Sequence, residues 1–208
     1  MTTLPAALPP VIGANRCLPV GNLGSACAAA PTAPAAGARY GRPMRLRLRP
    51  LAEGDESELR RIHETPEVSR WWDLPDEGFP WDEPESTRFT IEVDGAIAGM
   101  IQYSEEPEPK YRHAWIDVFV DPALHGRGVG SEAVRRVVRM LFDERGHHRI
   151  TIDPAASNLA AVRAYEKAGF ERVGIMRRAE RDADGRGWHD ALMMELVAEA
   201  PPPAPAAP

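Results

Sequence analysis

Three glycines on alternate positions, Gly126, Gly128 and Gly130, precede a segment whose pattern predicts a helix, and this arrangement can bind an anion. Residues without side chains let successive backbone N–H groups converge on a phosphate, and the helix N-terminus adds its partial positive charge. The donors would come from residues 126–131, with Arg127 adding a guanidinium group. The simpler alternative is a flexible turn that leads into a core helix.

The loop matches neither of the two common nucleotide-binding patterns. A mononucleotide P-loop needs lysine and then serine or threonine after its last glycine, whereas Ser131 and Glu132 follow Gly130 here. A dinucleotide fingerprint would need a glycine at position 131, and the strand before the loop belongs to a meander rather than to a βαβ unit. A phosphate held by backbone donors remains the functional interpretation.

A second pair of residues follows one predicted strand later. Asn158 and Tyr165 are seven positions apart on a predicted helix, so they share a face and are separated by roughly 10 Å along its axis. The motifs HGRGVG, DPAASN and AYEKAGF, in this order and spacing, resemble the acetyl-CoA signature of the GNAT superfamily of N-acetyltransferases. The resemblance spans residues 45 to about 197. His125 stands where that superfamily usually has glutamine or arginine, which puts the role of this side chain in question.

A narrower resemblance concerns the acceptor of the acetyl group. The segments PEVSRWW, WID and ITIDPAASNLAAVRAYEKAGFERVG are similar to aminoglycoside 6′-N-acetyltransferases. This resemblance implies an acetyl-CoA-dependent N-acetyltransferase that modifies a polycationic small molecule, with an aminoglycoside 6′-amino group as the best candidate. The alternatives are a protein N-terminus, a polyamine or a siderophore amine as acceptor, or a CoA-binding sensor without catalysis.

The resemblance also implies which residues bind acetyl-CoA, the expected cosubstrate. The pyrophosphate would lie on the glycine loop, and N–H groups of a strand that splays from its neighbour would hold the oxyanion. Asn158 would bind the pantetheine arm, cap its own helix, or do both. The expected cofactor-binding residues are Val118, Phe119, Val120, His125, Gly126, Arg127, Gly128, Val129, Gly130, Ser131 and Asn158.

Asp117 and Tyr165 are the expected catalytic residues. Asp117 interrupts the apolar run WIDVFV, so it would act as the base or orient the substrate ammonium, unless it simply points to solvent. Tyr165 would protonate the departing thiolate, or else be a half-buried aromatic residue. The substrate would contact Trp71, Trp72, Asp117 and Asp153, since aromatic rings and carboxylates attract ammonium groups. Core packing of the tryptophans and a turn-capping role for Asp153 are the simpler alternatives.

Charge is distributed unevenly along the chain. The net charge is −6, yet residues 51–110 carry 17 acidic and 5 basic residues, whereas residues 111–199 carry 14 of each. A field of one sign in a cleft concentrates the opposite sign, and nucleic acid would require a basic surface. A solubilising acidic surface is the simpler explanation. We therefore expect a cationic small-molecule amine as partner and no nucleic acid, with the protein a monomer or a homodimer.

Hydrophobic periodicity predicts the elements that position these residues. Strands are expected at residues 44–51, 88–93, 96–104, 113–120, 149–153, 170–178 and 188–197, and helices at 55–63, 67–72, 131–142 and 158–168. A meander followed by alternating strands and helices predicts one α/β (α+β) domain, with a mixed, mostly antiparallel sheet and helices on both faces. Residues 71–86, WWDLPDEGFPWDEPES, are expected to form a loop because they are rich in proline and acidic residues.

Composition sets the expected domain boundaries. Residues 1–43 are mostly Ala, Pro and Gly and are expected to form a disordered extension. Met44 is a possible true start of translation. The domain is expected at residues 44–199, followed by a disordered tail at 200–208. No secretory signal or apolar run of 18 residues is present, so we expect a cytoplasmic protein that does not enter a membrane. No metal is expected, because both cysteines lie in the first segment and His147 with His148 suggests a surface turn.

Overall fold

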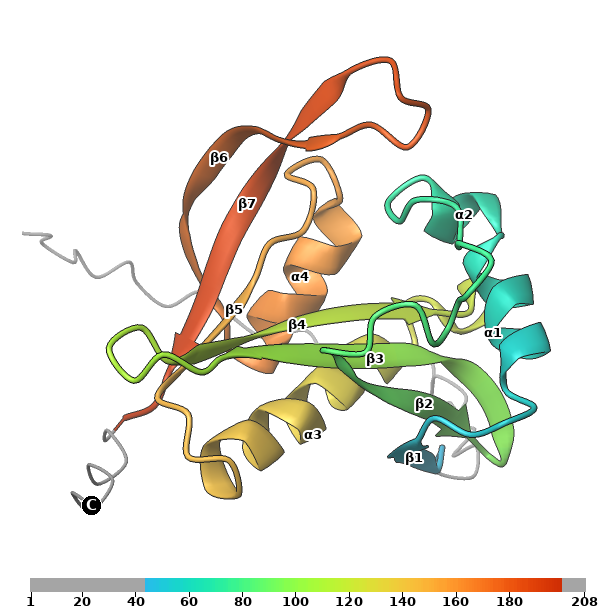
Figure 1. Cartoon of the computed structure of the whole chain (residues 1–208), viewed down its shortest axis with the longest axis horizontal. Coiled ribbons are helices and arrows are strands. Elements are labelled where there is room, and N and C mark those ends of the chain that lie inside the picture. Colours follow the sequence, from blue (N-terminus) through green and yellow to red (C-terminus); the bar gives the residue numbers. More distant parts are fainter. Residues whose placement is uncertain (1–43, 200–208) are drawn as a thin grey trace, which may run out of the picture. The chain divides into compact units, whose positions relative to one another are not determined.

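A seven-stranded sheet organises residues 44–199, the part of the chain that the computed structural model describes (Figure 1). Its strands are β1 (Leu46–Pro50), β2 (Thr87–Val93), β3 (Ala96–Glu106), β4 (His113–Val120), β5 (Arg149–Ile152), β6 (Glu171–Arg181) and β7 (Trp188–Val197). The order is β1-β2-β3-β4-β5-β7-β6, and all neighbours are antiparallel except β4 and β5. The expected mixed, mostly antiparallel sheet is confirmed, whereas the expectations for residues 1–43 and 200–208 lie outside the described residues.

Helices cover both faces of the sheet, as expected. They are α1 (Glu56–His63), α2 (Pro66–Ser69), the single 3-10 turn η1 (Pro122–Leu124), α3 (Val129–Asp143) and α4 (Leu159–Ala168). One large core cluster joins α3 and α4 to one face through residues such as Val134 and Val162. A second cluster joins α1 and α2 to the other face through Leu59, Ile62 and Val68. The α-helices therefore bury apolar side chains against the sheet, whereas η1 buries none.

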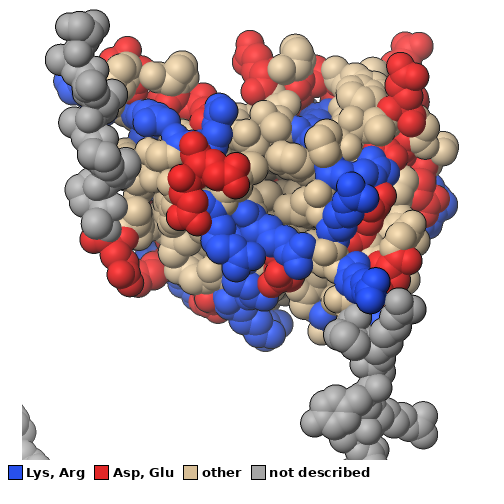
Figure 2. Space-filling view, turned by 90° about the horizontal axis from the view of Figure 1, so that it is seen from below, with Lys and Arg blue, Asp and Glu red and all other residues tan. Residues whose placement is uncertain are grey.

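The outer side of α3 is polar. The stripe of Val134, Val138 and Leu141 is buried, and three arginines occupy the opposite side of the helix. They are Arg135, Arg136 and Arg139. Figure 2, a view onto the underside of Figure 1, shows basic side chains gathered on this face of the molecule. The arginines are thus the solvated face of a core helix.

The feature that opens the sheet is the short pairing of β4 with β5. Only two register pairs join these strands, Ala114 with Ile150 and Trp115 with Thr151. β4 nevertheless continues to Val120 and stays paired with β3 over that length. Among the described residues, the rest of β4 therefore has no strand on the side of β5, and β5 and β7 turn away from it (Figure 1). The splay that the resemblance implied is present.

Two helix boundaries differ from the expectation by more than one residue. The helix expected at 67–72 ends at Ser69, because the N–H groups of Trp71 and Trp72 both donate to the carbonyl oxygen of Val68, at 2.9 and 3.1 Å, and form a turn. The helix expected to start at residue 131 starts at Val129, because Gly128 adopts a left-handed conformation at the N-cap. These differences move the end of one helix by three residues and the start of the other by two, and they leave the buried faces of both helices unchanged.

The histidine pair after α3 was interpreted wrongly in part. His147 is buried, and its Nε2 lies 2.6 Å from Oε1 of Glu105 at the end of β3, so it is not in an exposed turn. Arg145 pairs with the same carboxylate.

Across residues 44–199 no helix is long and apolar enough to cross a membrane. The cytoplasmic location stays a prediction.

Candidate active site

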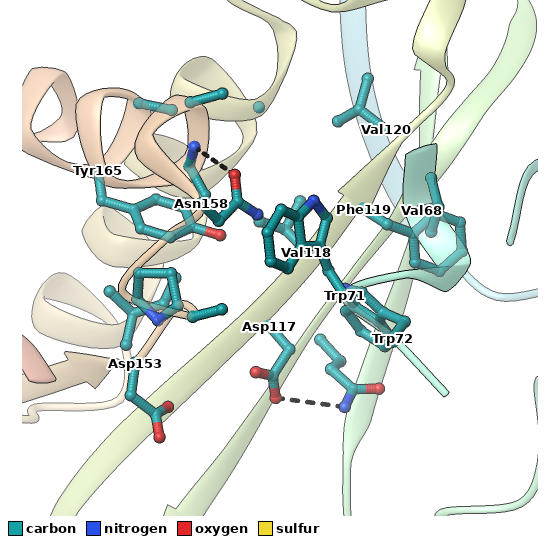
Figure 3. A pocket seen from close by; sticks show the side chains of 18 of the residues that line it. Val68, Trp71, Trp72, Asp117, Val118, Phe119, Val120, Asp153, Asn158 and Tyr165 are labelled. Carbon is teal, nitrogen blue, oxygen red and sulfur yellow. Dashed lines mark hydrogen bonds between the residues drawn. The ribbon is translucent and has the colours of Figure 1, made fainter. Parts of the chain in front are cut away.

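A cleft of about 1330 Å³ lies where β4 and β5 separate. Its walls come from β4, the turn before α3, α4 with the segment before it, the β6–β7 hairpin, and the acidic loop, residues 71–86. Every residue that the sequence suggested for the site lines this one cleft (Figure 3). They are Trp71, Trp72, Asp117, Val118, Phe119, Val120, residues 125–131, Asp153, Asn158 and Tyr165.

The glycine turn, residues 125–131, is shaped by left-handed backbone angles. The φ angles of Gly126 and Gly128 are 74° and 83°, which L side chains rarely adopt. Open space surrounds both positions, so glycine is required there for conformation rather than for fit. The Nε2 of His125 lies 2.8 Å from the carbonyl oxygen of Val120, which ties the turn to the end of β4. His125 therefore contributes to the site by ordering the turn.

The N-terminus of α3 presents unpaired N–H groups beside this turn. The helix bond at this end runs from the N–H of Glu132 to the carbonyl oxygen of Gly128, at 3.0 Å. The N–H groups of residues 129–131 precede it and have no acceptor inside the helix. The N–H of Arg127 donates to the carbonyl oxygen of Leu124 at 3.3 Å, so Arg127 can reach a ligand through its exposed side chain only. This arrangement favours an anion.

Val118, Phe119 and Val120 belong to the part of β4 that β5 leaves unpaired. Val118 and Val120 pack toward the cluster that contains α3 and α4, whereas Phe119 is buried in the cluster on the other face. Successive strand side chains point to opposite faces, so a ligand beside β4 meets the backbone edge of these residues. Free N–H groups on such an edge can stabilise a developing oxyanion.

Asp117 projects from β4 into the cleft (Figure 3). Burial raises its pKa to about 6, and the charges of Asp153, Glu83 and Glu180 act in the same direction. The hydrogen bond from Nε2 of Gln102 to Oδ2 of Asp117, 3.4 Å long, opposes this rise. The carboxylate is half-buried by surface area, so it is depleted of water yet still open to a substrate. A pKa near neutrality suits a group that accepts a proton at physiological pH.

Carboxylates from other segments share the cleft with Asp117. Asp153 follows β5, Glu180 lies on β6, and Glu83 belongs to the acidic loop. Enclosure by the cleft walls raises the pKa of both Asp153 and Glu180, although their side chains are exposed to the cleft itself. The sequence suggested Asp153 but not Glu180, since nothing local to β6 indicates that it faces the cleft. Negative charge from several directions attracts a cation with more than one charge.

The start and the body of α4 supply Asn158 and Tyr165. Oδ1 of Asn158 accepts a hydrogen bond from the N–H of Ala161 at 3.1 Å, which confirms that it caps α4, and its amide nitrogen faces the cleft (Figure 3). Tyr165 lies two turns later, with its ring buried and its hydroxyl directed into the cleft. Burial raises the pKa of Tyr165, and the charges of Asp117 and Asp153 raise it further. Tyr165 therefore stays protonated and can act only as a proton donor.

Trp71 and Trp72 both line the cleft but differ in their surroundings. Trp72 packs edge-on against His63 and Phe119, with ring centroids 5.5 and 5.2 Å apart. Trp71 is half-buried, and the guanidinium of Arg70 lies 4.8 Å from its ring centroid. Trp72 supports the wall of the cleft, whereas Trp71 already holds a cation against its ring. Trp71 is therefore better placed than Trp72 to meet a substrate.

Several residues of the cleft could not be found from the sequence. His63 is 3% exposed and enclosed by three aromatic rings, and this burial lowers its pKa. Arg88 and Gln102 are buried polar residues of β2 and β3. Trp115 is 37% exposed, lines the cleft and belongs to the last β4–β5 pair. Strand alternation shows which residues share a face, but only the packing of α1, α2 and the acidic loop shows that this face is a cleft.

The comparison with protein families bears directly on this site. The model described as "Acetyltransferase (GNAT) family" matches residues 47–170, more than half of the chain, including the glycine turn, Asp117, Asn158 and Tyr165. The chain belongs to the GNAT family of acetyltransferases. The resemblance carried by the motifs HGRGVG, DPAASN and AYEKAGF is confirmed.

Curated relatives within the GNAT family include aminoglycoside acetyltransferases. "Aminoglycoside N(6′)-acetyltransferase type 1" of Klebsiella pneumoniae is 44% identical over 75 residues, which are 36% of this chain and 36% of that protein. The "Kanamycin resistance protein" of Rhizobium radiobacter is 51% identical over 75 residues, 36% of this chain and 68% of that protein. The first match thus covers only about a third of the length of that relative.

Solved structures of GNAT acetyltransferases match the fold over a greater length. Aminoglycoside acetyltransferase AAC(6′)-Ib in complex with coenzyme A has a TM-score of 0.61 and 26% identity, covering 74% of this chain and 96% of that one. Spermidine N-acetyltransferase from Vibrio cholerae in complex with CoA and spermine has a TM-score of 0.62 at 19% identity, covering 73% and 95%. At that identity the second match supports the fold alone.

Proposed function

We propose that this protein is an acetyl-CoA-dependent N-acetyltransferase whose acceptor is an amine of a polycationic small molecule, with an aminoglycoside 6′-amino group as the leading candidate. One observation carries the proposal. Asp117, which has a raised pKa, and the hydroxyl of Tyr165 face the same cleft as the glycine turn and the unpaired edge of β4. A base, an acid and an anion cradle in one cleft are the groups that acyl transfer to an amine requires.

The residues of the cleft fit acetyl-CoA. The N–H groups of residues 129–131 and the side chain of Arg127 would hold the pyrophosphate, as backbone donors at helix N-termini commonly do. The amide nitrogen of Asn158, which its capping role leaves free, would donate to the pantetheine arm. The splay of β4 from β5 leaves an open backbone edge between these two positions. Bound there, acetyl-CoA supplies an acetyl group activated as a thioester.

The chain's own groups can then move the protons of the reaction. Asp117 accepts the proton that the substrate ammonium must lose before its nitrogen can attack the carbonyl carbon. N–H groups on the open edge of β4, at Val118 and Val120, stabilise the negative oxygen as the new C–N bond forms, whereas the N–H of Phe119 is directed at β3. Tyr165 donates its proton to the sulfur as the C–S bond breaks. The second proton that the attacking nitrogen loses passes through water to restore the Tyr165 hydroxyl, and Asp117 releases its proton to the solvent. The products are an amide and a free thiol.

The acidic walls support a polycationic acceptor. Asp117, Asp153, Glu83 and Glu180 approach the cleft from four segments, so a substrate with several ammonium groups can neutralise more than one of them. Because aminoglycoside 6′-acetyltransferases are among the relatives, we propose an aminoglycoside 6′-amino group as the leading acceptor among such substrates. A linear polyamine satisfies the same charge pattern and is therefore the competing acceptor.

Thiol release from acetyl-CoA, measured with matched amines, tests the proposal. Kanamycin, which carries a 6′-amino group, should be turned over, and a related aminoglycoside with a 6′-hydroxyl group in its place should be turned over at least tenfold more slowly. Spermidine and short peptides with a free N-terminus complete the panel. Faster turnover of spermidine than of kanamycin would assign a polyamine, rather than an aminoglycoside, as the acceptor. If CoA binds but no amine is turned over, the proposed enzymatic function is wrong.

A further inference from the structure

Three polar residues form a row across the sheet beneath the acidic loop. Arg88 on β2 is the register partner of Gln102 on β3, and Gln102 is the register partner of Asp117 on β4. Register partners in antiparallel strands point to the same face, so the three side chains lie side by side. Arg88 is 7% exposed and Gln102 is 5% exposed. Buried polar side chains of this kind must be hydrogen-bonded to be tolerated.

Arg88 is held rigidly by the acidic loop. Its Nη1 donates to the carbonyl oxygen of Pro80 at 2.6 Å and to Oδ1 of Asp82, and its Nη2 lies 3.1 Å from Oε1 of Glu83. Its remaining donor, Nε, bonds to Oε1 of Gln102 at 2.7 Å. A guanidinium group is planar and has donors only, so the Gln102 amide must present its oxygen to Arg88.

The opposite end of the same amide is thereby directed at two carboxylates. Nε2 of Gln102 donates to Oε2 of Glu83 at 3.1 Å and to Oδ2 of Asp117 at 3.4 Å, the second bond being the longer. Gln102 is the only residue among those described that donates a hydrogen bond to the Asp117 side chain. The other groups that face Asp117 are Asp153 after β5, Glu180 on β6 and Tyr165 on α4, and none of these carries positive charge.

We propose that Gln102, locked by Arg88, is a positioning residue that orients the Asp117 carboxylate toward the acceptor amine and favours its charged form. The proposal rests on the proposed function for the reaction that Asp117 serves. Arg88 acts indirectly, because its contacts with Asp82 and Glu83 hold the acidic loop while its bond to Gln102 fixes the side-chain amide. An amide free to flip would present its oxygen to Asp117 and repel the charged carboxylate.

Replacement Gln102→Leu tests this role, because leucine nearly preserves volume and removes both hydrogen-bonding ends. We expect the ionisation midpoint of Asp117, measured by ¹³C NMR of its carboxyl carbon, to rise by about half to one pH unit. The acidic limb of kcat/KM for the amine should move upward by the same amount. We expect kcat to fall about tenfold while the Kd for CoA stays within twofold, since Gln102 lies outside the glycine turn and α4.

A second variant covers the case in which Gln102→Leu does not fold because Arg88 loses an acceptor. Gln102→Glu keeps an acceptor for Arg88 and forms an ion pair with it, but a carboxylate cannot donate to Asp117. We expect an upward shift of the Asp117 midpoint at least as large as in the leucine variant. The matched control is Thr90→Val on β2, which removes a buried polar group that bonds to Asp55 at 2.7 Å and has no contact with Asp117. Its midpoint and kcat should equal those of the unmodified protein.

The two readouts separate this proposal from the proposed function. An unchanged Asp117 midpoint in a folded Gln102→Leu or Gln102→Glu protein overturns the role of Gln102, whatever the turnover. A shifted midpoint in a protein that acetylates no amine supports the positioning of Asp117 and removes the acetyltransferase function. An equal shift in Thr90→Val overturns the specific contact and assigns the effect to general loosening of the sheet.

Discussion

Trp115 of β4 and Thr151 of β5 form the last pair between the two strands, and the sheet opens beyond them. Asp117 follows Trp115 by two residues and Asp153 follows Thr151 by two, so each strand carries one carboxylate just past the point of separation. Both carboxylates line the cleft, and the charge of Asp153 helps to raise the pKa of Asp117. The divergence of two parallel strands thus opens the cleft and creates the electrostatic setting of Asp117.

Replacement Asp117→Asn removes the base and preserves the shape of the side chain. We expect turnover at pH 7.5 to fall by about 10²-fold to 10⁴-fold, the range typical of general-base removal. The Kd for CoA should change by less than twofold, because the glycine turn and Asn158 are untouched. Unchanged turnover would remove Asp117 from the base role.

The same carboxyl should make activity depend on pH with a defined sign. Asp117 acts as a base only when charged, and its pKa is raised to about 6, so kcat/KM should rise with pH through a limb centred near that value. In Asp117→Asn the residual activity should lack this limb. A pH-rate profile from pH 5 to 9 provides the measurement, and a wild-type limb centred near pH 4 would contradict the assignment.

The free energy of unfolding should fall as the pH rises, whereas kcat/KM should increase. The pKa of Asp117 is higher in the folded protein than the ordinary aspartate value of 3.8, so the folded state binds more protons and unfolding becomes easier as the pH rises from about 4 to about 6. Above that window Asp117→Asn should be the more stable protein, by about 1 to 2 kcal/mol after allowance for its partial exposure. Thermal unfolding at pH 4 and pH 7.5 tests this, and an equal difference in Tm at the two values would be inconsistent with it.

Tyr165→Phe removes only the hydroxyl group. Because burial keeps Tyr165 protonated, its loss should lower kcat by about 10-fold to 100-fold at every pH without changing the position of the acidic limb. KM for the amine should change little. As a control, the steady-state kinetics of the variant are measured with acetyl-CoA and with a thioester of a more acidic thiol. A more acidic thiol leaves without needing a proton, so this thioester should restore most of the rate of the variant. Equal loss with both thioesters would argue against the proton-donor role.

The two roles of Asn158 can be separated by a pair of variants. Asn158→Ser keeps an oxygen that can accept from the N–H of Ala161 and loses the amide nitrogen that faces the cleft, whereas Asn158→Ala loses both. We expect the alanine variant to be less stable by about 1 kcal/mol, the usual effect of losing an N-cap, and the serine variant to be nearly unaffected. Both should bind CoA several-fold more weakly. Normal CoA affinity in both would limit Asn158 to capping.

Local patterns were sufficient to predict most elements of this fold. Alternation in β4, whose bounds coincide with the expected 113–120, and the stripe of α3 reflect side-chain periodicities that neighbouring residues alone establish. Gly169 ends α4 in the left-handed conformation that is usual for a glycine directly after a helix. The insertion of β7 between β5 and β6 has no local signature, because strand order depends on contacts between distant segments.

By itself, the sequence determined the glycine turn, the helix that carries Tyr165, and the positions of Asp117 within one strand and Asp153 after another, since each depends on residue type and short-range spacing. Only the tertiary structure placed Arg88, Gln102, Glu83 and Glu180 around Asp117. Their approach depends on strand register, on the packing of the acidic loop and on the separation of β4 from β5, and none of these is encoded by neighbouring residues. The raised pKa of Asp117 is a property of that assembly, because burial and the charges of distant segments produce it.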